Sequence, residues 1–240
     1  VAMAGLYLWA GLSLMDVGLW AACVGSYVLA LFRWMEGQPV RQWVLPSLVV
    51  ALSVTRPDAL LVVPGIAAVV VLVYGFNRLS IRAAAHVGMT LVATTALLVG
   101  ARLAYFGYPL PNTYYTKVSP DLAYRLGFGL RYILDYFIEH LLSVLPASVA
   151  LGALAVSVLA TARRGFSSPR ETGSDGVAGR AAALFGGAVC VGAVSVVVVG
   201  GDHFQGHRFL QAYLPLLAVP MAVTAARLAG RPATRTALAR

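Results

Sequence analysis

Three polar segments carry most of the side chains that could bind an anion or move a proton. They are residues 55–58 (Thr-Arg-Pro-Asp), 109–117 (Pro-Leu-Pro-Asn-Thr-Tyr-Tyr-Thr-Lys) and 200–208 (Gly-Gly-Asp-His-Phe-Gln-Gly-His-Arg), and they interrupt an otherwise apolar sequence. Guanidinium groups grip phosphate in a bidentate manner, carboxylates can act as general bases, and amides and aromatic rings suit sugars. The combination favours a ligand that carries both phosphate and hydroxyl groups.

The first segment contains Arg56 and Asp58, which permit two interpretations. In one, they form an ion pair at the start of a helix, with the Asp58 carboxylate near the positive end of the helix dipole. In the other, Arg56 holds a phosphate group. Ionisable residues inside apolar, membrane-like sequence are functional candidates by default. Both interpretations stay open from the sequence.

The second segment offers Asn112, Tyr114, Tyr115 and Lys117, the only lysine of the chain. The amide and the aromatic rings suit the hydroxyl and C–H surfaces of a sugar, and the ammonium suits a phosphate. The alternative is a belt of interfacial tyrosines with a lysine that extends toward water.

The third segment is the densest, with Asp202, His203, His207 and Arg208 within seven residues. We expect Asp202 to accept a sugar hydroxyl or act as a general base, the histidines to contact substrate and Arg208 to bind phosphate. The two histidines are four residues apart and could join Asp202 in a metal site on a helix, but the glycines argue against a helix. We therefore predict no metal and no cofactor. Asp16, before an apolar run, is either a helix N-cap or a second catalytic candidate.

The elements that must position these residues are membrane helices. Hydrophobic residues make up 60% of the chain and charged residues 11%, whereas soluble domains carry about 25% charged residues. Apolar runs of about 20 residues span a bilayer as helices, which satisfy their own backbone hydrogen bonds. The sequence predicts an all-α polytopic membrane bundle of about seven transmembrane helices. The expected spans are 17–34, 43–55, 59–76, 83–105, 143–161, 182–200 and 209–227, of which the second is short and contains Pro46.

The net charge of +9 follows membrane topology rather than nucleic-acid binding. Twelve of the eighteen basic residues lie in alternate connections, which the positive-inside rule makes cytoplasmic together with the C-terminus. All three polar segments then fall on the outer face. The basic cytoplasmic residues are Arg33, Arg41, Arg78, Arg82, Arg163, Arg164, Arg170, Arg180, Arg227, Arg231, Arg235 and Arg240.

Three further regions complete the predicted organisation of a single domain over 1–240. Residues 121–140 carry Arg131, Asp135 and Glu139 every four residues, which predicts an amphipathic helix on the outer membrane surface. Residues 162–180 are rich in Gly, Ser and charge, which predicts a flexible cytoplasmic linker, and 228–240 form a basic tail. The chain begins without Met, and we expect part of the natural N-terminus to precede Val1.

At its polar segments the chain resembles the GT-C glycosyltransferases of bacterial cell-envelope synthesis, in particular the arabinofuranosyltransferase-like group. The resemblance lies in four pieces whose order spans most of the chain. They are Ser-Leu-Met-Asp at 13–16, Arg-Pro-Asp at 56–58, Pro-Asn-Thr-Tyr-Tyr-Thr-Lys at 111–117, and Gly-Gly-Asp at 200–202 followed by Arg-Phe-Leu at 208–210. Asp16 stands where the family has Glu, and Val17 where it has Thr.

The resemblance implies transfer of a sugar from a polyprenyl-phosphate donor to a cell-envelope glycan or glycolipid at the outer face of a bacterial-type plasma membrane. The family usually carries a catalytic acidic residue in the first outer loop, which would lie upstream of Val1 in this chain. Two other classes remain open, a ligase or polymerase of lipid-linked glycans and a non-enzymatic transporter or flippase component. A transporter would place ionisable groups near the middle of the bilayer, whereas here they gather at one rim.

Overall fold

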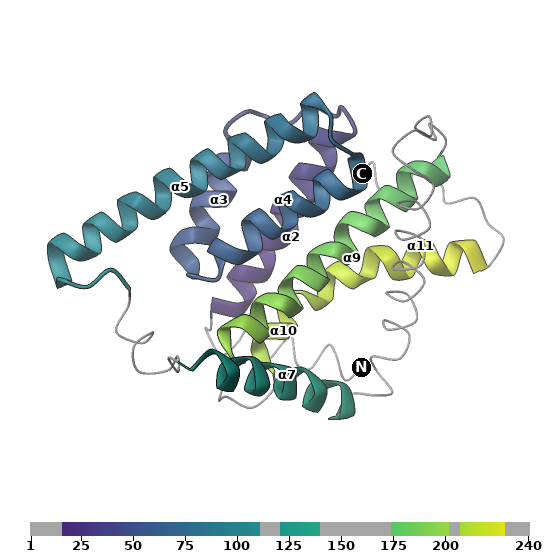
Figure 1. Cartoon of the computed structure of the whole chain (residues 1–240). Coiled ribbons are helices and arrows are strands. Elements are labelled where there is room, and N and C mark those ends of the chain that lie inside the picture. The colour runs from purple at the N-terminus through teal and green to yellow at the C-terminus, as the bar shows by residue number, and fades with distance from the viewer. Residues whose placement is uncertain (1–15, 111–120, 140–173, 202–206, 229–240) are drawn as a thin grey trace.

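The computed structural model describes residues 16–110, 121–139, 174–201 and 207–228, which form helices and turns without a strand (Figure 1). The elements are α2 (Asp16–Met35), α3 (Val44–Thr55), α4 (Ala59–Tyr74), α5 (Arg78–Phe106), α7 (Leu122–Glu139), α9 (Ser174–Val199), α10 (Arg208–Gln211), the 3-10 helix η1 (Leu214–Leu217) and α11 (Ala218–Leu228). The predicted all-helical fold is confirmed for this part of the chain.

Three of the described helices are long and apolar enough to cross a membrane, within Val17–Met35, Arg78–Phe106 and Gly176–Val199. Two shorter apolar helices accompany them, Val44–Thr55 and Ala59–Tyr74, together with the apolar stretch Leu214–Ala226, which covers η1 and most of α11. A helix rises about 1.5 Å per residue, so the 12 residues of α3 reach well short of a hydrocarbon layer of about 30 Å. The expected span 143–161 lies outside the described residues, and the count of about seven spans stays a prediction.

The predicted span 209–227 is wrong as a single helix, because this segment divides into α10, η1 and α11. Pro215 lies at the start of η1, where its missing N–H and its ring prevent the α-helix from continuing through it. Pro220 then lies near the start of α11, where a proline is tolerated. Pro215 is therefore the sequence feature that marks the break.

The predicted linker 162–180 extends too far, because α9 begins at Ser174 and includes residues 174–180. The physical reason lies at Arg180, whose guanidinium donates from Nε to Glu36 Oε1 at 2.7 Å and from Nη2 to Glu36 Oε2 at 2.8 Å. This ion pair holds the first turns of α9 against the end of α2. Composition alone missed the partner, which is distant in the sequence.

The core of the bundle is formed by α2, α3, α4, α5 and α9, with the antiparallel pair α4 and α9 packed extensively at its centre. A Cβ added to Gly65 would lie 2.6 Å from Val191, and one added to Gly187 would lie 2.5 Å from Val69. Each helix thus sets a glycine against a valine of the other, which lets the two backbones approach closely, as small residues do between membrane helices.

The bundle has two ends that are marked by different side chains. At the Arg56 end lie the start of α2, the turn between α3 and α4, the end of α9 and the short α10 (Figure 1). At the Glu36 end, the Tyr74 hydroxyl donates to Glu36 Oε1 at 2.9 Å beside the Glu36–Arg180 pair. Because successive helices run in opposite directions, the polar residues around Arg56 and those around Glu36 lie at opposite ends of the bundle.

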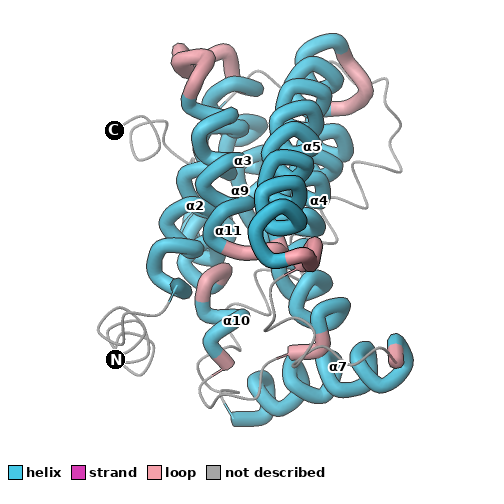
Figure 2. The backbone as a smooth tube through the Cα atoms, turned by 90° about the vertical axis from the view of Figure 1, so that its left-hand side faces the viewer, coloured by secondary structure: helices cyan, strands magenta, loops and turns pink. Residues whose placement is uncertain are grey.

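The amphipathic helix predicted at 121–140 is confirmed as α7, which lies across the Arg56 end of the bundle (Figure 2). Asp121 caps it, because its Oδ1 accepts from the backbone N–H groups of Ala123 at 2.9 Å and Tyr124 at 3.2 Å. A Cβ on Gly129 would lie 2.5 Å from the carbonyl oxygen of Val197, so α7 and α9 cross in backbone contact. The crossing fixes α7 over the end of α9.

Candidate functional site

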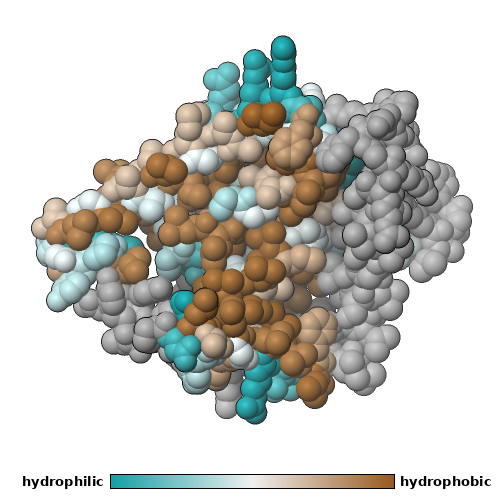
Figure 3. Space-filling view, viewed as in Figure 1, coloured by the Kyte–Doolittle hydropathy of each residue, from teal (hydrophilic) through white to brown (hydrophobic). Residues whose placement is uncertain are grey.

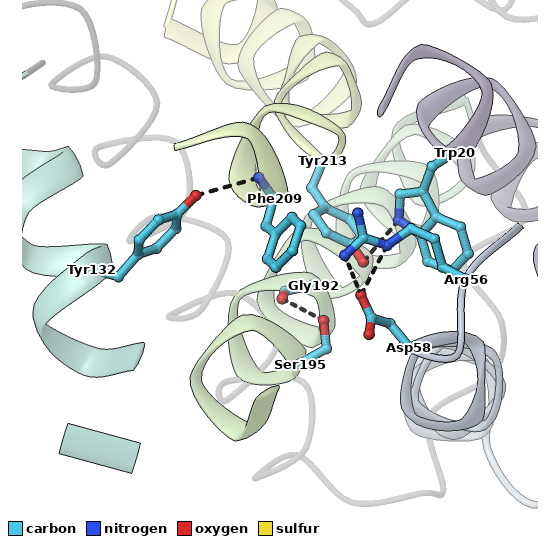
Figure 4. Close-up of polar contacts among 8 residues, drawn as sticks. All are labelled: Trp20, Arg56, Asp58, Tyr132, Gly192, Ser195, Phe209 and Tyr213. Atoms are coloured by element: carbon cyan, nitrogen blue, oxygen red, sulfur yellow. Dashed lines mark hydrogen bonds and ion pairs between the residues drawn. The ribbon is translucent and has the colours of Figure 1, made fainter. Parts of the chain in front are cut away.

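The Arg56 side chain is the centre of the candidate site (Figure 4). Arg56 directly follows α3 with extended backbone angles, φ −150° and ψ 141°, and its N–H still closes the helix by donating to Leu52 O at 3.0 Å. Two residues later, Asp58 precedes α4. The short turn through Pro57 therefore places guanidinium and carboxylate side by side.

Arg56 and Asp58 form an ion pair that is almost fully buried. Arg56 donates from Nε at 3.0 Å and from Nη2 at 2.6 Å to Asp58 Oδ2, and the two side chains are only 10% and 13% exposed. Removing either partner would leave an uncompensated charge in an apolar site, at a cost of several kcal/mol. The ion pair of the first interpretation is therefore present. The second interpretation, in which Arg56 holds a phosphate group, stays a prediction.

Aromatic rings from distant elements enclose the Arg56 guanidinium. Its Cζ lies 4.0 Å from the ring centroid of Phe209 on α10 and 5.7 Å from the Trp20 ring on α2. Trp20 Nε1 donates to the Tyr213 hydroxyl at 3.1 Å, and the Tyr213 ring fills the space over Gly192 of α9 (Figure 4). Cation–π contacts of this kind are stronger where water is excluded.

Arg208 approaches the same ring from its own position on α10. Its Cζ lies 5.3 Å from the Phe209 centroid, and the residue is half-buried, in contrast to buried Arg56. The Phe209 ring thus contacts the guanidinium groups of both arginines that the sequence predicts to bind phosphate. The first and third polar segments, distant in the sequence, meet at Phe209.

His207 links this cluster to α7. Its backbone is left-handed (φ 51°, ψ 40°), and its buried ring packs against Tyr132 and Tyr136 at centroid distances of 4.7 and 5.3 Å. His207 Nδ1 lies 3.6 Å from Glu139 Oε2, and the Tyr132 hydroxyl accepts from the Phe209 N–H at 3.4 Å. Burial raises the pKa of Tyr136, so the Tyr136 hydroxyl stays protonated at neutral pH. These contacts fix the start of α10, and with it the position of Phe209.

The structure brings together four of the predicted site residues: Arg56, Asp58, His207 and Arg208. Asp16 begins α2, but its side chain lies outside the described part, as do Asn112, Tyr114, Tyr115, Lys117, Asp202 and His203. Their roles stay predictions. Within the described residues, no three His, Cys, Asp or Glu side chains gather closely enough to hold a metal ion.

Sequence reasoning missed the aromatic residues of the site, which are Trp20, Tyr132, Phe209 and Tyr213. Two of them stood next to recognised features: Trp20 lies one turn into the span that begins at Asp16, and Phe209 directly follows Arg208. Tyr132 and Tyr213 gave no comparable signal, because only the packing of α7 and α9 brings them to the cluster.

Comparison with known protein families, curated proteins and solved structures finds no match to this chain.

Proposed function

We propose that this chain acts in an integral-membrane glycosyltransferase that moves a sugar from a polyprenyl-phosphate donor to a cell-envelope glycan or glycolipid. The observation that carries the proposal is that the guanidinium groups of Arg56 and Arg208 both lie against the ring of Phe209. Two cations held at one rim of an apolar bundle suit a ligand with a phosphate head and a hydrocarbon tail. Phosphate would bind at the rim while the tail lies between helices and lipid.

The role of each residue follows from the negative charge that develops on the departing phosphate during the proposed reaction. An acceptor hydroxyl attacks the anomeric carbon of the sugar, a C–O bond forms, and the C–O bond to phosphate breaks, so that polyprenyl phosphate leaves with additional negative charge. Arg208, half-buried, and Arg56, held in place by Asp58 and Phe209, would stabilise that charge. Asp202 or Asp16 is the proposed base that takes the acceptor proton.

Arg56→Lys and Arg208→Gln, introduced separately into the full-length protein, test these roles. Membranes that contain each variant are incubated with labelled polyprenyl-phosphate monosaccharides, and transfer of the label is measured. We expect each change to lower the rate roughly 10²-fold or more, as the loss of one preorganised donor does elsewhere. Arg131→Gln is the matched control, since Arg131 lies on α7 at the same end and its side chain is 80% exposed.

The outcomes separate the classes that the sequence leaves open. Transfer of single sugars supports the proposal, transfer of preassembled chains indicates a ligase or polymerase, and movement of the donor across the membrane without transfer indicates a transporter. Activity that is unchanged in both variants, with normal insertion into the membrane, would refute the phosphate role of the two arginines, and absence of any sugar transfer would refute the proposed glycosyltransferase activity.

We also propose that the protein crosses a bacterial-type plasma membrane several times, with the Arg56 end outside and the C-terminus inside. Tyr124 on α7 and Trp43 before α3 are exposed, 59% and 60%, at opposite ends. In a chain whose Cys23 and Cys190 are replaced by Ala, Tyr124→Cys should react with a membrane-impermeant maleimide in intact cells. Trp43→Cys should react only after lysis. The reverse pattern would invert the proposed orientation.

A further inference from the structure

A basic stripe runs along the first turns of α5 at the Glu36 end of the bundle. Arg78, Arg82 and His86 are spaced four residues apart, which places them on one face of the helix. Both arginines are exposed and His86 is half-buried. The start of α5 is fixed by a capping box, in which Asn77 Oδ1 accepts from Ser80 N at 3.0 Å and Ser80 Oγ accepts from Asn77 N at 3.1 Å. The stripe therefore has a defined position.

The end of α2 lies beside this stripe. The Trp34 ring packs against the His86 ring with 6.0 Å between centroids, and Arg33 precedes Trp34 in α2. Arg33 Nε and His86 Nε2 are both shielded from solvent, and among the described residues neither has a hydrogen-bond partner. A buried polar nitrogen without a partner is energetically unfavourable, and more so when the group is charged. These two shielded nitrogens lie on neighbouring helices that the Trp34–His86 contact joins, and they favour a ligand that supplies acceptor oxygens.

Glu36, the acidic residue at this end whose side chain the structure describes, does not neutralise the stripe. Glu36 accepts hydrogen bonds from Nε and Nη2 of Arg180 and from the Tyr74 hydroxyl. Hydrophilic side chains project from this end above an apolar flank, as the top of Figure 3 shows. Among the described side chains, the stripe therefore keeps its positive charge at the boundary between polar and apolar surface (Figure 3).

Exposed aromatic side chains flank the same end. Trp43, directly before α3, is 60% exposed and Phe76, in the turn from α4 to α5, is 76% exposed. Aromatic residues gather at the headgroup depth of membranes, where basic residues also attract anionic lipids. The flanking aromatic residues and the positive charge of the site together favour a lipid headgroup over a soluble anion.

We propose that Arg33, Arg82 and His86 bind the headgroup phosphate of an anionic phospholipid, whose acyl chains lie along the exposed apolar surface of α5. Phosphate oxygens are acceptors for both buried nitrogens, and Arg78 adds attraction at the edge of the site. The described α5 surface beyond this point offers exposed Met89, Val92 and Leu97 to the acyl chains. The site lies at the end opposite Arg56 and depends only on membrane insertion, not on sugar transfer.

The test measures binding of fluorescent phosphatidylglycerol to the full chain in a neutral detergent. Arg82→Gln should weaken binding about fivefold, as one basic residue near an anionic surface does. Arg33→Gln should weaken it about tenfold, because a charge-assisted hydrogen bond is lost. Arg41→Gln, in the exposed loop at the same end, and Arg102→Gln, at the far end of α5, are charge-matched controls that should change binding less than twofold.

Competition decides the source of the phosphate. Unlabelled phosphatidylglycerol should displace the probe, whereas phosphatidylcholine, inorganic phosphate and glycerol phosphate at the same concentration should not. Equal displacement by the soluble phosphates would overturn the assignment to lipid. An Arg41→Gln loss equal to that of Arg82→Gln would show a diffuse charge effect and overturn the site. Because gel filtration of every variant monitors folding, weak binding by a monodisperse variant cannot be attributed to unfolding.

Discussion

The ion pair between Glu36 and Arg180 should determine how firmly α9 is held in the bundle. Its Nε–Oε1 and Nη2–Oε2 distances of 2.7 and 2.8 Å are those of a bidentate, charge-assisted contact, and the side chains are only 12% and 18% exposed. Breaking a fully buried pair by removing one partner costs about 3–5 kcal/mol. Since some solvent reaches this pair, we expect Arg180→Ala to lower the free energy of unfolding by about 3 kcal/mol.

The matched comparison is Arg131→Ala, which removes a pair of the same charge type from α7. Arg131 Nε lies 3.7 Å from Asp135 Oδ2, and the side chains are 80% and 48% exposed, so the loss should stay below about 0.5 kcal/mol. Unfolding in mixed micelles of a denaturing and a mild detergent measures both values. The reasoning is refuted if the two variants differ by less than about 1 kcal/mol.

A double-substitution cycle isolates the interaction between the two residues. Glu36→Gln and Arg180→Gln should each destabilise the protein, and the double variant should cost clearly less than the sum of the two, by about 2 kcal/mol, because the residues are in direct contact. Additive costs would mean that Arg180 acts through packing along its apolar stem rather than through Glu36.

Other substitutions probe the contacts that position the site, and the same unfolding assay measures each. Gly129→Ala should destabilise the protein by about 1–3 kcal/mol, because the added Cβ meets the backbone of α9. Gly127 lies on the same helix with open space around it, so Gly127→Ala should stabilise the protein by up to about 1 kcal/mol. Equal effects of the two changes would contradict the backbone contact. Tyr213→Phe should cost about 1–3 kcal/mol by leaving the buried Trp20 N–H without its acceptor, and no loss would show that another acceptor takes its place. Asn77→Ala removes the cap of α5 and should cost about 1 kcal/mol, while Asn77→Ser should retain most of it.

The local features of the fold were the most predictable. Apolar run length gave the helices around 16–35, 44–55, 59–74 and 78–106 to within a few residues, because each helix satisfies its backbone bonds internally. The four-residue spacing of Arg131, Asp135 and Glu139 likewise gave α7. The predicted span 209–227 is wrong because Pro215 interrupts the α-helix there. The predicted linker 162–180 is too long because Arg180 pairs with Glu36, which is distant in the sequence.

For the candidate site, the sequence supplied the charged residues and their side of the bundle. Segments 55–58 and 200–208 were both expected at one face, and Arg56 and Arg208 do meet there. Their meeting through Phe209 was not predictable, because cation–π geometry depends on where α10 lies relative to the α3–α4 turn. That position rests on the packing of His207 against the tyrosines of α7.

The sequence by itself determined that this chain forms apolar helices interrupted by three polar segments, since hydropathy and helical period are properties of local composition. Only the tertiary structure decided which charges are paired. Asp58 holds Arg56, Glu36 holds Arg180, and Arg33 and His86 are left with buried nitrogens that lack a described partner. Pairing depends on helix direction, crossing and close approach at residues such as Gly65 and Gly187, and these arise from contacts between distant segments.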